Sequence, residues 1–125
     1  MADELRYSKD HEWVRIAEDG SAVIGVTDFA AGQLGDVVYV DLPPDVGDSS
    51  RRGTEMGEIE STKSVSDLFS PIDGTVLSVN QDVVDSPELV NASPFDKGWL
   101  ITASFDELPP EDLLSAEEYS RLTEA

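Results

Sequence analysis

One lysine in this chain stands in a setting that suits covalent attachment. Lys63 lies in the run Glu58-Ile-Glu-Ser-Thr-Lys-Ser-Val-Ser-Asp67, where side chains alternate in character on both sides of a short Ser-Thr-Lys-Ser break. Alternation of period two around such a break predicts a β-hairpin with Thr62 and Lys63 at its turn. Because Ser61, Thr62 and Ser64 are small, the amine would project into water with nothing bulky beside it. Such a lysine is either a solubilising charge or an attachment point.

The composition removes most other kinds of chemical site. The 125 residues contain no Cys and a single His, His11. Disulfides, thiolate metal sites and Cys nucleophiles are therefore excluded, and a His-based metal site or a Ser-His-Asp triad is disfavoured. We expect no metal ligands and no catalytic residues, and we interpret His11 as a packed or solvent-facing side chain. Any redox chemistry would need a cofactor to bring the sulfur or the electrons.

The charge is strongly negative and narrows the range of partners. Asp and Glu number 27 against 8 Lys and Arg, a net charge of −19. Such a surface repels phosphate backbones and anionic membranes and attracts basic patches on other proteins. An acidic proteome would produce the same bias. We expect a soluble monomer that binds neither nucleic acid nor membrane. An enzyme that modifies lysine has only Lys9, Lys63 and Lys97 to choose from.

The chain start and the apolar runs indicate a soluble protein. Met-Ala-Asp-Glu resembles neither a signal nor a transit peptide, and no apolar run reaches membrane-spanning length. We expect a cytoplasmic protein of bacterial type, or a mitochondrial matrix protein only if a transit peptide has been removed.

Local patterns predict a mainly β domain with short helical inserts. Thr27-Asp28 and Gly35 bound a short helix over 29–34, and Ser86-Pro87 begins a helical turn that reaches Val90. Ser115-Ala-Glu-Glu118 is a capping box, so the segment of about 109–123 is predicted as a helix that docks through Leu113, Leu114 and Tyr119. Strands are predicted at 5–7, 12–17, 22–26, 37–41, 53–61, 64–69, 75–79 and 99–103.

Together these elements predict one domain over residues 1–125 with a core at about 5–104. Seven or eight short strands at regular spacing favour a small sandwich or flattened barrel of two antiparallel sheets. Trp13, Val38 and Trp99 are interpreted as core residues.

Several motifs, in order along the chain, resemble one family. Glu60-Ser-Thr-Lys-Ser64 between two strands, followed by Ser70-Pro-Ile-Asp-Gly74, looks like the attachment hairpin of a lipoyl domain. With these, the chain resembles the glycine cleavage system H-protein family from about Leu5 to the C-terminal helix. The further motifs are His11-Glu-Trp13, Gly25-Val-Thr-Asp28, Leu34-Gly-Asp-Val-Val38, Ser86-Pro-Glu-Leu-Val-Asn91, Pro94-Phe95 and Gly98-Trp-Leu100.

The resemblance implies a lipoyl-domain-like fold and a carrier that is not itself an enzyme. Lys63 would hold lipoic acid as an amide, attached by a lipoate ligase or lipoyl transferase. The pyridoxal-phosphate decarboxylase (P-protein) would load an aminomethyl group from glycine onto the arm, and the aminomethyltransferase (T-protein) would remove it. Dihydrolipoyl dehydrogenase (L-protein) would then reoxidise the arm.

The resemblance also implies roles for four further residues. Glu60 and Gly74 match positions used for recognition by the lipoylating enzymes, although a solvated strand Glu and a turn Gly explain them as well. Glu12 and Asp67 match acidic positions near a cleft that shelters the loaded arm, and carboxylates would attract its cationic amine. Ordinary surface charge is the competing interpretation. Gln33 departs from relatives that have a His there, which weighs against a cleft role that needs a titrating group at this position.

Other functions remain open from the sequence. The same hairpin could belong to a lipoyl-relay protein similar to H-protein, or to the lipoyl domain of a 2-oxoacid dehydrogenase complex. The latter domains are typically shorter and have Asp-Lys-Ala at the tip, whereas a biotin domain has Met on both sides of the lysine. A hydrolase with paired carboxylates or a plain acidic binding module is the third possibility, but no acidic pair stands in an evident apolar pocket.

Overall fold

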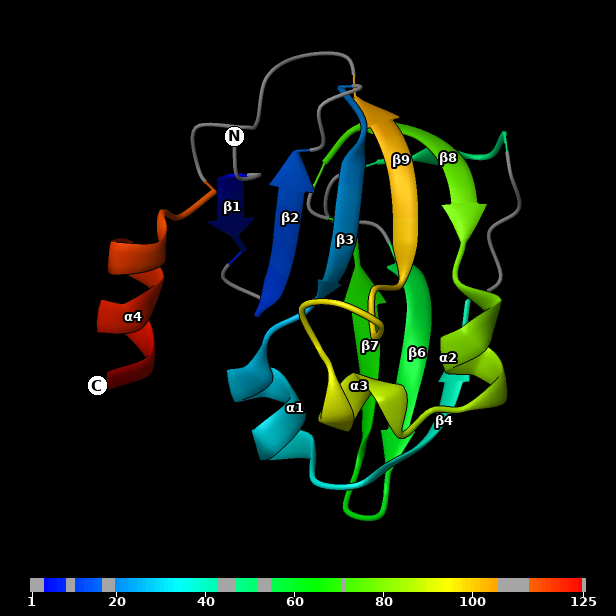
Figure 1. Cartoon of the computed structure of the whole chain (residues 1–125), viewed down its shortest axis with the longest axis vertical. Coiled ribbons are helices and arrows are strands. Elements are labelled where there is room, and N and C mark those ends of the chain that lie inside the picture. Colours follow the sequence, from blue (N-terminus) through cyan, green and yellow to red (C-terminus); the bar gives the residue numbers. More distant parts are fainter. Residues whose placement is uncertain are drawn as a thin grey trace.

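A computed structural model describes residues 4–8, 11–16, 20–42, 47–51, 55–70, 72–105 and 113–124. Within these ranges the chain forms two antiparallel sheets and four helices, which confirms the predicted mainly β fold (Figure 1). Predicted helix or strand positions 17, 53–54 and 109–112 lie outside the described residues.

The larger sheet has the strand order β1-β2-β3-β9-β8-β5 and the smaller one the order β4-β6-β7. The strands are β1 (Glu4–Tyr7), β2 (Glu12–Ile16), β3 (Ala22–Val26), β4 (Val37–Asp41), β5 (Ser49–Ser50), β6 (Glu55–Ser61), β7 (Val65–Phe69), β8 (Gly74–Val79) and β9 (Ile101–Phe105). The helices are α1 (Asp28–Leu34), α2 (Gln81–Asp85), α3 (Leu89–Ala92) and α4 (Ala116–Glu124). Since β1 and β5 end the larger sheet without pairing to each other, the described strands form an open sandwich and not a closed barrel.

The apolar core fills the space between the two sheets. Ile24 and Val76 of the larger sheet form one buried cluster with Val40, Ile59 and Leu68 of the smaller sheet. Burial of this apolar surface is the main force that holds the sheets together.

Two of the three predicted core residues are in packed positions, and one prediction is wrong. Trp13 is fully buried and its indole nitrogen donates to the Pro94 carbonyl at 2.9 Å. Trp99 is half-buried against the same aromatic cluster. Val38, in contrast, is 56% exposed. A register shift between Val37 and Tyr39 interrupts the alternation of β4, so Val38 turns away from the core.

The helix ends follow local side-chain chemistry. Thr27 caps α1 by accepting a hydrogen bond from the Ala30 amide at 3.1 Å, and Gly35 ends the helix with φ +80°, both as predicted. The N-cap of α2 is Asn80, whose side chain accepts from the Asp82 amide; this helix was not predicted. The predicted turn at Ser86 leads into α3, whose N-cap is Glu88 and not Ser86.

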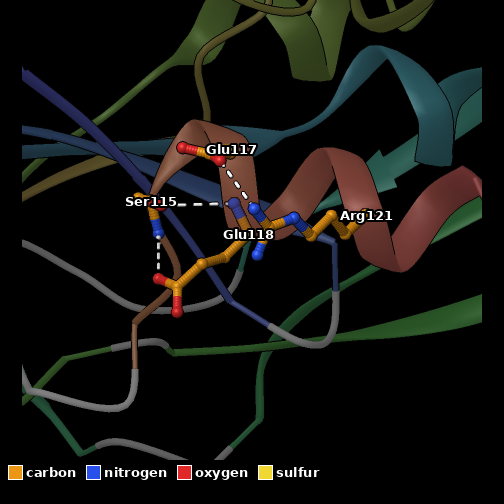
Figure 2. A network of polar contacts seen from close by, with 4 residues as sticks. All are labelled: Ser115, Glu117, Glu118 and Arg121. Carbon is orange, nitrogen blue, oxygen red and sulfur yellow. Dashed lines mark hydrogen bonds and ion pairs between the residues drawn. The ribbon is translucent and has the colours of Figure 1, made fainter.

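The C-terminal helix has the predicted capping box but begins at Ala116, so residues 113–115 of the segment predicted at about 109–123 are not helical. The backbone amide of Ser115 donates to a Glu118 carboxylate oxygen at 3.0 Å, and the Glu118 amide donates to the Ser115 hydroxyl at 3.2 Å (Figure 2). The hydrogen bond from the Ser115 backbone lowers the pKa of Glu118 below its ordinary value. One turn along, Glu117 and Arg121 form an exposed ion pair of 2.7 Å (Figure 2).

The C-terminal helix docks on the edge strand β1 as predicted (Figure 1). The backbones of Tyr7 and Leu114 exchange two hydrogen bonds, and the rings of Tyr7 and Tyr119 stack with centroids 4.7 Å apart. Leu113 and Tyr119 are both buried, and burial raises the pKa of each tyrosine in the stack. None of the described helices has the length and apolar character needed to cross a membrane.

Candidate functional site

The predicted hairpin is present, and its turn is fixed by Ser61. In β6 and β7, Glu60 pairs with Val65, and the turn between the strands closes with a hydrogen bond from the Ser61 amide to the Ser64 carbonyl at 2.8 Å. The Ser61 hydroxyl oxygen accepts from the amides of Lys63 and Ser64 at 3.2 and 3.1 Å. Because one side chain satisfies two backbone donors in the turn, the lysine is held on a defined backbone.

The Lys63 side chain is exposed and lies across the loop that joins α1 to β4. Its Cε would be 3.1 Å from a Cβ built on Gly35, and the Thr62 amide donates to the Asp36 carbonyl at 3.1 Å. Within the part of the chain that the structure describes, the Lys63 ammonium makes neither a hydrogen bond nor an ion pair. The amine is therefore accessible to a modifying enzyme.

A cavity of about 440 Å³ lies beside this lysine, between α1 and the hairpin. Its wall is mostly apolar, and its polar groups come from the hairpin, from α1 and from the residue before β2. The lining residues are His11, Val26, Phe29, Ala30, Gln33, Leu34, Ile59, Ser64, Ser66, Asp67 and Leu68. Since Ser64 follows Lys63 directly in the chain, a group attached to the lysine needs only to fold back to reach the cavity.

The structure separates the two carboxylates that were predicted near the arm. Asp67 lines the cavity. Glu12 does not, and is only 2% exposed; its two carboxylate oxygens accept from the Ser8 hydroxyl at 3.2 Å and from the Phe69 amide at 2.8 Å. Glu12 therefore ties β2 to the end of β7 from the interior.

One known protein family matches nearly the full length of the chain. A family model described as "Glycine cleavage H-protein" matches residues 5–125. The chain belongs to the glycine cleavage H-protein family.

Individual relatives agree with this family. A glycine cleavage system H protein from Streptomyces avermitilis is 57% identical over 120 residues, which are 96% of this chain and 94% of the relative. One from Thermobifida fusca is 54% identical over 121 residues, 97% and 94% of the two chains. The crystal structure of a glycine cleavage system H protein from Mycobacterium marinum is 37% identical, covers 100% of both chains and superposes with a TM-score of 0.88.

The two residues predicted for recognition lie in different parts of this H-protein fold. Glu60 is half-buried on β6 between Tyr39 and Val65, next to the turn. Gly74 begins β8, where it pairs with Phe105, and β8 begins at the other end of the long axis from the β6–β7 turn (Figure 1). The structure therefore brings Glu60 close to Lys63 along the hairpin and leaves Gly74 far from it.

A row of carboxylates crosses the small sheet two residue pairs beyond Glu60 and Val65. Asp41, Glu58 and Asp67 occupy matching positions on β4, β6 and β7. Partial burial raises the pKa of Glu58, and the neighbouring carboxylates of Glu60 and Asp67 raise it further. The hairpin therefore presents concentrated negative charge on the strands that lead to the turn, which favours a partner with basic groups.

The contacts that hold the turn in place were not predicted. Gly35 was expected only to end α1, yet it also provides the surface on which Lys63 lies. Asp36 holds the turn through its backbone carbonyl, which no sequence pattern marks. Asn91 was part of a family motif, but nothing local to it indicates its partners.

Proposed function

We propose that this chain is the lipoyl-carrying shuttle of the glycine cleavage system, with lipoic acid joined by an amide to Lys63. The observation that supports this most directly is the exposed Lys63 amine, which has no partner among the residues described, at a fixed turn beside a mostly apolar cavity. In this role the chain takes the aminomethyl group from the P-protein to the T-protein and is then reoxidised by the L-protein. We propose that the whole chain is one such carrier domain and that it works as a cytoplasmic monomer.

The residues around Lys63 fit a lipoyl group. The small side chains of Ser61, Thr62 and Ser64 leave the tip slim enough to enter a partner's active site, and the cavity offers apolar wall to a hydrocarbon arm. When bound, the dithiolane supplies the sulfur that carries the one-carbon unit and the redox couple. The protein itself supplies position: a tethered carrier visits several active sites at high effective concentration. We therefore propose that the chain has no catalytic residues of its own.

We propose that Asp67 meets the cationic amine of the loaded arm and that Glu12 acts indirectly. Asp67 lines the cavity, so its carboxylate is available to a group that enters from Lys63. Both Glu12 oxygens are already occupied by Ser8 and Phe69, so its contribution is to keep the end of β7 in place.

We also propose that Glu60 and Gly74 contribute to recognition by the lipoylating enzymes. Glu60 stands on the strand that leads to the turn. Gly74 begins β8 of the larger sheet, so its recognition would require an enzyme that contacts this end of β8 as well as the hairpin turn, and an unchanged lipoylation rate in Gly74→Ala would remove it from the proposal.

Lipoylation in vitro tests the central proposal. Protein incubated with lipoate, ATP and a lipoate ligase should gain one lipoyl group by intact mass, and peptide mapping should place it on Lys63. The matched variant Lys63→Arg keeps the positive charge and should gain none. The lipoylated protein, but not Lys63→Arg, should support glycine decarboxylation by a P-protein. A label on Lys9 or Lys97, or activity retained by Lys63→Arg, would overturn the assignment.

A further inference from the structure

We infer that Asn91 is a positioning residue for Lys63, which it controls through the α1–β4 loop without touching the lysine. This inference rests on the proposed function, because it concerns how the attachment lysine is presented to the lipoylating enzyme. Asn91 belongs to α3, which lies beside α1 (Figure 1).

The Asn91 side chain makes three hydrogen bonds, all to backbone groups at the end of α1 and in the loop that leads to β4. Its amide nitrogen donates to the Gly35 carbonyl at 2.8 Å and to the Ala31 carbonyl at 3.4 Å. Its amide oxygen accepts from the Val37 amide at 2.8 Å. The donors and the acceptor are therefore satisfied together by the end of α1 and the start of β4, which fixes where the chain passes between them.

The same loop carries the turn that bears the lysine. Between Gly35 and Val37, whose backbones Asn91 both binds, the Asp36 carbonyl accepts from the Thr62 amide at 3.1 Å. Gly35 faces the Lys63 stem, so closely that a Cβ there would come within 3.1 Å of the lysine Cε. A displacement of the loop therefore moves both the turn and the surface under the lysine.

Asn91 sits where it can position the site without supporting the core. The residue is exposed, and its partners lie on one loop and the adjoining end of α1. Gln33 and Leu34, at that end of α1, also line the cavity. Asn91 therefore sets the gap between α1 and the hairpin at the lysine, and loss of its bonds should disturb this region more than the global fold.

A second asparagine in the same chain provides a matched control. Asn80 makes the same kind of clasp: it donates to the Lys97 and Trp99 carbonyls at 3.0 and 2.7 Å and accepts from the Asp82 amide at 3.1 Å. It is 5% exposed and caps α2, which none of the residues lining the cavity belongs to. Asn91→Asp and Asn80→Asp each replace two donors by a negative charge without changing size.

The experiment compares the two variants in the full chain by two measurements. The first is hydrogen exchange of the Thr62 amide, followed by ¹⁵N NMR in the unmodified protein. We expect Asn91→Asp to speed this exchange about tenfold, the scale set by the loss of one or two hydrogen bonds. The second is steady-state lipoylation by a lipoate ligase. We expect kcat to fall about tenfold with KM nearly unchanged, because the docking surface is intact but the amine is misplaced.

Asn80→Asp should leave the Thr62 exchange rate and the lipoylation kinetics of the folded protein at the wild-type level. This should hold even if Asn80→Asp lowers the melting temperature more than Asn91→Asp does. Asn91→Ala removes the three bonds without adding charge and should act in the same direction. Wild-type Thr62 exchange and wild-type lipoylation kinetics in both Asn91 variants would overturn the inference. If wild-type Lys63 accepts no lipoyl group, the proposed function fails instead, while the exchange measurement still tests the clasp.

Discussion

Glu60 is the charged side chain of β6 that lies nearest in sequence to Lys63 without belonging to the turn. It is half-buried between Tyr39 and Val65, so its carboxylate is available to an enzyme that approaches the hairpin face. We predict that Glu60→Ala lowers kcat/KM of lipoylation about tenfold, the value of one charge-assisted contact, with little change in melting temperature. Glu58→Ala, two residues earlier on the same strand, is the control. Equal losses of lipoylation and stability in Glu60→Ala would point to a structural role.

A separate prediction concerns Asp67, because its side chain lines the cavity. A carboxylate beside a cationic amine slows its escape, so Asp67→Asn should speed the decay of the loaded arm several-fold. The measurement is ammonia and formaldehyde release from loaded protein after the P-protein is removed. Asp41→Asn removes a charge from the same carboxylate row without touching the cavity. If both variants decay alike, general surface charge and not Asp67 protects the arm.

At the scale of elements, the acidic row on the small sheet predicts a pH effect. Glu58 has a pKa raised above its ordinary 4.5, first by partial burial and then by its acidic neighbours. A raised pKa means that the folded state binds this proton more tightly than the unfolded state. Protonated Glu58 therefore contributes to the stability of the folded state below about pH 4.5, and this contribution is lost as pH rises through the pKa of Glu58 in the folded state. We predict that Glu58→Gln raises the melting temperature slightly at pH 7.

Two conditions check the cause of that gain. It should shrink in high salt, which screens the repulsion, and vanish below pH 4, where wild-type Glu58 is protonated. A gain that persists at low pH would show that the substitution acts through packing and not through charge.

Local sequence signals predicted most of the elements. They failed for Val38 in β4 and for the helix α2 that Asn80 caps. The hairpin, α1 and the capping box of α4 each follow from residues within a few positions of one another. Val38 was misassigned because the register shift in β4 depends on pairing with β6, which alternation along β4 alone does not reveal. The Asn80 cap had a local signal, an Asn followed by an acidic first turn, and could have been found.

At the scale of the whole molecule, the cavity wall α1 is held from both ends by distant side chains. Asn91 binds its C-terminal end from 56 residues away in the chain. Tyr119 of α4, 92 residues away from Thr27, lies with its hydroxyl 2.7 Å from the Thr27 hydroxyl at the N-cap of α1. Neither pairing leaves a mark in the local sequence, since hydrogen-bonding residues of these types are common and only the tertiary fold brings them together.

The contact between the Tyr119 hydroxyl and the N-cap of α1 leads to a prediction that links the C-terminal helix to the cavity beside Lys63. Its hydroxyl also lies 2.8 Å from Nδ1 of His11, which lines the cavity, so Tyr119→Phe removes two hydrogen bonds at once. We expect a loss of about 1–3 kcal/mol in the free energy of unfolding, because the buried Thr27 hydroxyl loses a partner. We also expect faster hydrogen exchange of the Ala30 amide, which Thr27 caps.

Tyr39→Phe is the matched control, since Tyr39 is 46% exposed and its hydroxyl has no partner among the described residues. Urea unfolding should separate the two variants, with Tyr39→Phe within experimental error of wild type. A Tyr119→Phe protein with wild-type stability and wild-type Ala30 exchange would mean that α4 packs on the sandwich without bracing the cavity. A loss confined to Tyr119→Phe would make the C-terminal helix part of the frame that positions the lysine's cavity, in agreement with its place against β1 and the cap of α1.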